Sequence, residues 1–68
     1  MDDKTYKIVE IVGTSGTSFS DAVSNGVAKA AKTLHGLGWF EVIEQRGTIT
    51  DGKVDQFQAT IKVGFRLD

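Results

Sequence analysis

The apolar and polar positions of this chain change their period twice and divide it into four elements. Residues 4–12, KTYKIVEIV, are rich in β-branched and aromatic residues and predict a strand with apolar groups on both faces. Apolar residues then recur at spacings of three and four from Phe19 to Leu34, which predicts an amphipathic helix with a stripe of mainly small residues. Segments 39–50 and 53–67 predict two more strands, so the order is strand, helix, strand, strand.

The connections between these elements also have recognisable sequences. Residues 13–18, GTSGTS, predict a plain connecting loop, because the glycine and lysine spacings of a phosphate-binding loop are absent. Ser18 and Asp21 have the spacing of a capping box at the start of the helix, and Gly36 or Gly38 would end it. Asp51-Gly52 predicts a two-residue type I′ turn, which makes the last two strands a hairpin.

This turn fixes the register of the hairpin and therefore the face on which each side chain lies. Trp39 is expected opposite Gly64, and Gln45 opposite Gln58, with both pairs on the face away from the helix. The face toward the helix is expected to carry Phe40, Val42, Glu44 and Arg46. A bulge near residues 45–47 would reverse the faces beyond it.

The size of the chain favours assembly into oligomers. With 68 residues, no cysteine and one histidine, it is expected to form a single small domain over residues 1–68, without disulfides or the ligands of a structural zinc site. A last strand over residues 53–67 would span roughly 50 Å at ~3.4 Å per residue, whereas a compact chain of this length is about 30 Å across. The hairpin should therefore extend past the helix and expose backbone edges that invite pairing with other chains.

Composition argues against several classes of function. The chain carries 8 basic and 9 acidic residues without a basic patch, so nucleic acid is not expected as a partner. Its apolar runs are too short for a membrane span or signal peptide, which predicts a cytoplasmic protein without a membrane partner.

A catalytic role is also not expected, because no set of nucleophile, base and acid is present. His35 should be an exposed residue near the end of the helix. Glu41 and Glu44, which alternate on a strand, should point to opposite faces and cannot form a carboxylate pair. No metal ligands are predicted. The chain is therefore expected to bind, not to catalyse.

The single tryptophan, Trp39, is the most informative side chain. The register places it on the face away from the helix, opposite the bare backbone of Gly64. Chemistry alone favours an indole that covers this glycine or fills a subunit contact. A stacking platform for a flat ligand is the alternative, because indole offers a broad face at low entropic cost.

Four fragments together resemble one family. TYKIVEIVGTS, GWFEV, RGTITDG and FQATIKVGFRL occur in order over essentially the whole chain and are similar to the sequences of dodecins. The resemblance implies an α+β fold in which a three-stranded antiparallel sheet wraps around one helix, in the order β-α-β-β. It further implies a hollow homododecamer that binds flavins, FMN or riboflavin, as stacked pairs between symmetry-related tryptophans. Bacterial members of the family also suggest coenzyme A as a possible ligand.

The resemblance also assigns roles to three residues of this chain. Trp39 matches the tryptophan that stacks on the flavin, Gln58 the glutamine that hydrogen-bonds the polar ring edge, and Arg46 a basic position that helps to hold a flavin phosphate. In the predicted register Gln58 pairs six residues along the strand from Trp39, roughly 20 Å away at ~3.4 Å per residue. Each flavin is therefore expected to take its tryptophan and its glutamine from different subunits.

The function that follows from this resemblance is storage and photoprotection of free flavins, with electron transfer from Trp39 quenching the excited ring. Two alternatives stay open at the level of sequence. One is a structural shell or interaction module in which Trp39 anchors an interface. The other is a flavin-dependent oxidoreductase, although stacking between tryptophans would block both faces of the ring.

Overall fold

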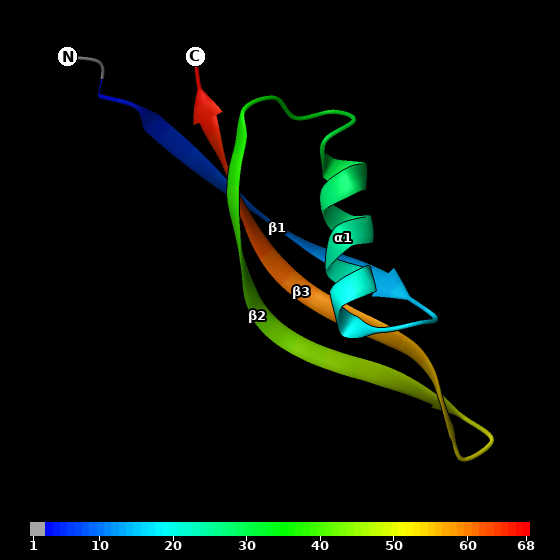
Figure 1. The fold of residues 1–68 in the computed structure, drawn as a ribbon. Helices are drawn as coiled ribbons and strands as arrows, with labels where there is room; N and C mark the ends of the chain where they lie inside the picture. Colours follow the sequence, from blue (N-terminus) through cyan, green and yellow to red (C-terminus); the bar gives the residue numbers. More distant parts are fainter. Residues whose placement is uncertain (1–2) are drawn as a thin grey trace.

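The computed structural model describes residues 3–68 and contains one helix packed on one sheet (Figure 1). The elements are β1 (Thr5–Ser15), α1 (Phe19–Ala30), β2 (Leu37–Thr50) and β3 (Lys53–Leu67). The strands form one antiparallel sheet in the order β1-β3-β2, so that the last strand is central. The predicted fold class, with the order β-α-β-β and a curved sheet around the helix, is confirmed.

Two predicted boundaries differ from the structure. β1 continues three residues further, to Ser15, because Gly13, Thr14 and Ser15 still find pairing partners on β3. The helix ends at Ala30, whereas the apolar stripe had extended it to Leu34. Beyond Ala30 the backbone bonds tighten, and the amide of Thr33 donates to the carbonyl of Ala30 at 3.2 Å, one residue closer than in an α-helix.

The start of α1 is capped as predicted by Ser18, but the capping box is only half formed. The Ser18 hydroxyl accepts a hydrogen bond from the Asp21 amide at 3.0 Å. The Asp21 carboxylate does not return to Ser18, because it accepts the Ser15 hydroxyl at 2.6 Å. Buried Ser15 also accepts the amide of Thr17 at 2.8 Å. These bonds tie the end of β1 to the first turn of the helix.

The core lies between α1 and the strands β1 and β3. Its buried members are Ala22, Ala59, Ile61 and Val63. The helix comes close to β1, since a Cβ added at Gly26 would lie 3.2 Å from the Cα of Gly13. This confirms that the stripe of small residues allows close approach. We call the sheet face toward α1 the inner face and the opposite one the outer face.

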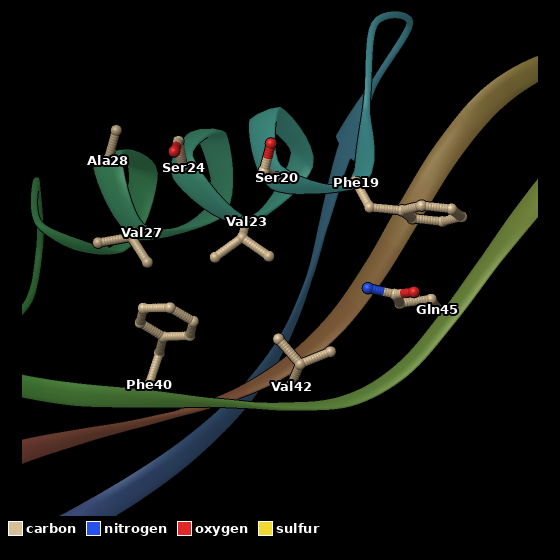
Figure 2. Close-up of a pocket in the computed structure, with 9 residues that line it drawn as sticks. All are labelled: Phe19, Ser20, Val23, Ser24, Val27, Ala28, Phe40, Val42 and Gln45. Atoms are coloured by element: carbon tan, nitrogen blue, oxygen red, sulfur yellow. The ribbon is translucent and has the colours of Figure 1, made fainter.

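The helix leaves much of the inner face uncovered. On β2, Phe40 and Val42 stay exposed although their side chains point toward the helix (Figure 2). The hairpin extends beyond the start of α1, and exposed Ile49 and Val54 lie near its tip (Figure 1). The turn has φ of 52° at Asp51 and 75° at Gly52, as a type I′ turn requires.

The dimensions of the chain are those of an elongated molecule. The principal extents are 56 × 20 × 14 Å, and the Cα radius of gyration is 14.1 Å. A compact domain of 68 residues would have a radius of gyration of roughly 11 Å. The predicted overhang of the hairpin is thus confirmed.

Candidate functional site

The candidate site residues are positioned by the register between β2 and β3. At the open end the predicted pairs hold, with Trp39 opposite Gly64 and Val42 opposite Ile61. A bulge then inserts Ile43, so that the following partners of β2 shift by one residue. A second irregularity between Thr48 and Ile49 restores the predicted register at the turn.

The bulge corrects two predicted placements. Arg46 does not lie on the inner face: it pairs with Gln58 and shares the outer face with it. Gln45 does not pair with Gln58 but with Ala59, and its side chain lies on the inner face (Figure 2). The physical reason is charge, because an unbroken register would have directed the ionised side chains of Glu44 and Arg46 toward the apolar core.

Trp39 occupies one end of the outer face. Its indole lies against Gly64, since a Cβ added at that glycine would overlap the six-membered ring of the indole. The side chain nevertheless remains 43% exposed. A large aromatic ring is therefore held against backbone on one side and is open to a further partner.

Tyr6, from β1, lies beside this indole and was not singled out in the sequence. The two ring centroids are 4.9 Å apart with an interplanar angle of 60°, an edge-to-face arrangement. No local sequence signal identifies Tyr6, because its place depends on the long-range pairing of β1 with β3, which puts Tyr6 opposite Arg66 and Ile8 opposite Gly64.

The polar candidates form a second group further along the same face. Gln58 lies between Thr14 of β1 and Arg46 of β2. Its carboxamide nitrogen donates to the side-chain oxygen of Gln56 at 3.0 Å. The guanidinium of Arg46 forms an ion pair with the carboxylate of Glu44. A carboxamide and a guanidinium thus belong to directly opposite residues on the outer face.

The two groups are too far apart to act on one flavin ring within one chain. Gly64, beneath the indole, and Gln58 are six residues apart on β3, or roughly 20 Å at ~3.4 Å per residue. A flavin ring system is about half that length. Each chain therefore presents two separate groups of candidate residues, an aromatic group with Trp39 and a polar group with Gln58 and Arg46.

A groove opens between α1 and β2 on the inner face (Figure 2). Its volume is about 630 Å³. Phe40 and Val42 point from β2 toward Val23 and Val27 of the helix, and Gln45 contributes the amide at one end. The groove is separate from the outer-face residues and consists mainly of apolar side chains.

Three further properties of the described residues concern a carboxylate pair, metal ligands and a membrane-spanning helix. Glu41 and Glu44 do not point to opposite faces as expected, because the bulge at Ile43 puts both on the outer face, Glu41 opposite Lys62 and Glu44 beside Arg46. Within residues 3–68 no three His, Cys, Asp or Glu side chains are grouped so as to hold a metal ion. Over the same residues no helix is long and apolar enough to cross a membrane.

Comparison with known proteins identifies the class to which this fold and surface belong. The family model described as Dodecin matches residues 5–68. The dodecin of Thermus thermophilus is 49% identical over 65 residues, covering 96% of this chain and 94% of its own length. Calcium dodecin of Mycobacterium tuberculosis is 27% identical over 62 residues, covering 91% of this chain and 87% of its own length.

Solved structures agree with this assignment. The dodecin of Streptomyces davaonensis has a TM-score of 0.96 at 49% identity and covers 98% of each chain. The dodecin of Streptomyces coelicolor has a TM-score of 0.95 at 47% identity, covering 100% of this chain and 97% of its own. The chain therefore belongs to the dodecin family.

Proposed function

We propose that this chain is a flavin-storage protein that binds FMN, riboflavin or related flavins as stacked pairs between the Trp39 side chains of neighbouring subunits. The observation that carries the proposal is the placement of the indole, held against Gly64 while 43% of the tryptophan stays exposed. Flavin binding is known for dodecins, and a flat isoalloxazine ring fits an exposed indole by stacking.

Assembly into a homododecamer is part of the proposal, because the isolated chain leaves too much surface open. It exposes 4921 Å², against about 4,200 Å² for a compact monomer of 7.3 kDa. The excess of roughly 700 Å² is surface that a compact monomer of this mass would not expose. The apolar groove beside Phe40 and Val42 and the exposed hairpin tip are the surfaces that neighbours would cover.

The assembly would also complete the ligand site. Trp39 of one subunit would stack on a ring whose polar edge is bonded by Gln58 of another, since these residues are roughly 20 Å apart within one chain. The carboxamide of Gln58 offers both a donor and an acceptor to that edge. Arg46, directly opposite Gln58, would meet the phosphate of FMN in this proposal.

Stacking of a flavin pair between two Trp39 side chains would explain how the protein stores flavins without catalysing a reaction on them. Indole is the most easily oxidised side-chain ring in the chain, so Trp39 can donate an electron to the photoexcited flavin and take it back, which quenches emission. Because both faces of each ring are covered, a substrate has no approach to it. We therefore propose a binding role and not an oxidoreductase.

A flavin titration with molar mass measured in the same preparation tests the proposal. Riboflavin or FMN should lose fluorescence on binding, in a species of about twelve subunits. Trp39→Ala should weaken binding by about ten- to a hundredfold and restore flavin fluorescence, because stacking is lost. Trp39→Phe keeps an aromatic face that is harder to oxidise, so it should bind with much less quenching.

The outcomes separate the proposal from its rivals. An assembled protein that ignores both flavins would be a structural shell. Unchanged flavin affinity in Trp39→Ala, with the assembly intact, would overturn the proposed site. Oxidation of NAD(P)H by the flavin-loaded protein would instead indicate an oxidoreductase.

A further inference from the structure

Tyr6 and Trp39 touch although their strands are not neighbours. β1 and β2 are separated by the central strand β3, so their backbones are roughly 10 Å apart. The two rings bridge this distance and meet edge to face, with centroids 4.9 Å apart. The bridge passes over Gly64, and any side chain at that position would collide with the indole.

A bulge beside Trp39 helps to form this contact. The register between β2 and β3 shifts between Leu37 and Trp39, which leaves Gly38 as the inserted residue. A Cβ added at Gly38 would lie 3.5 Å from a ring carbon of Tyr6, so the phenol ring packs close to this backbone. Tyr6 therefore rests against both the bulge and the indole that follows it.

We propose that Tyr6 is a positioning residue of the flavin site, which holds the indole of Trp39 against Gly64 and so presents one fixed stacking face to the ligand. The inference rests on the proposed function. A partly exposed tryptophan without lateral support would sample several rotamers, and binding would have to select one of them. Edge-to-face contact with Tyr6 removes that freedom before the ligand arrives.

The role belongs to the ring of Tyr6 and not to its hydroxyl. The geometry that connects Tyr6 to Trp39 and Gly38 involves ring atoms only. Tyr6→Phe should therefore behave like the parent protein. Tyr6→Leu keeps an apolar side chain but loses the flat edge, and it should weaken flavin binding by about two- to tenfold.

A readout without flavin tests the packing itself. Trp39 is the only tryptophan, so the intrinsic fluorescence of the ligand-free protein reports this one indole. Tyr6→Leu should lower the fluorescence anisotropy of the indole and shift its emission to the red, whereas Tyr6→Phe should not. Val12→Ala is the matched control, because Val12 lies on the same strand and face but pairs with Thr60, remote from Trp39.

The experiment measures indole anisotropy, flavin affinity and molar mass for the parent chain, Tyr6→Leu, Tyr6→Phe and Val12→Ala. A mobile indole and weakened flavin binding in Tyr6→Leu alone would support the proposal. An unchanged indole or unchanged affinity in Tyr6→Leu would overturn it, and so would an equal loss in Tyr6→Phe, which would assign the hydroxyl a direct contact. If the parent chain binds no flavin, the proposed function fails, while the anisotropy still decides whether Tyr6 fixes the indole.

Discussion

The indole of Trp39 lies against the backbone of Gly64, its direct register partner on the central strand. The contact exists because position 64 has no side chain. We expect Gly64→Ala to push the indole out of this position, since the added methyl group would overlap its six-membered ring. Flavin affinity should fall by about tenfold or more, as measured by fluorescence titration.

Gly16→Ala is the matched control for this substitution. A Cβ added at Gly16 meets no heavy atom within 4 Å, so it should change neither flavin affinity nor indole emission. Equal affinity in Gly64→Ala and the parent chain would show that the position of the indole against β3 is unimportant for binding.

Much of this arrangement was predictable from local sequence, because it depends on a turn and on side-chain alternation. Asp51-Gly52 sets the pairing next to the turn, and Trp39 lies opposite Gly64 as predicted because the irregularity between Thr48 and Ile49 and the bulge at Ile43 cancel. The bulge at Ile43 was expected two residues too late. The sequence did contain a signal for the earlier bulge: regular alternation would have directed the charged side chains of Glu44 and Arg46 toward the core.

The contacts of β1 could not be predicted in the same way. No short turn links β1 to β3, and apolar residues on both faces of β1 leave its register undetermined. The position of Tyr6 beside Trp39 depends on that long-range pairing. The length of α1 was overestimated, since Ala31 and Leu34 continue the apolar stripe without continuing the helix.

Separation of Trp39 from Gln58 leads to a prediction about mixed assemblies. Trp39→Ala and Gln58→Ala chains should each bind flavin weakly by themselves. When the two are refolded together in equal amounts, about a quarter of the sites should combine an intact tryptophan with an intact glutamine, if different subunits supply them. A tight-binding fraction of that size should appear in the flavin titration.

The reference for this experiment is a simple mixture of the two preassembled variants, which should show no tight-binding fraction. If one chain supplied both residues, co-refolding would create no intact site. Weak binding alone in the co-refolded sample, at the molar mass of the parent assembly, would therefore refute the two-subunit site.

The ion pair between Glu44 and Arg46 leads to a prediction about ligand preference. Arg46 is proposed to meet the phosphate of FMN, and Glu44 both occupies its guanidinium and repels a phosphate. Glu44→Gln should tighten FMN binding by about two- to fivefold, in keeping with the energy of an exposed ion pair. Riboflavin, which has no phosphate, should bind with unchanged affinity.

Glu10→Gln provides the charge-matched control, because Glu10 is on the same sheet face but pairs with Lys62 on β3. It should leave the ratio of the two affinities unchanged. An equal gain for FMN and riboflavin in Glu44→Gln would contradict a phosphate role of Arg46, and an effect that persists in high salt would contradict its electrostatic origin.

The exposed apolar side chains on the inner face of β2 lead to a prediction about which substitution would dissociate the oligomer. Val42 is 41% exposed in the single chain and lines the groove beside α1, so Val42→Ser should cost little in an isolated subunit. If a neighbouring chain covers the groove, the buried hydroxyl should weaken the interface in every subunit of the oligomer. Light scattering should then show smaller species, and flavin binding should be lost with them. Leu67→Ser is the control, because Leu67 lies at the exposed end of β3, and this variant should retain the parent molar mass. A Val42→Ser protein with the full molar mass of the parent oligomer would show that the groove is not an interface.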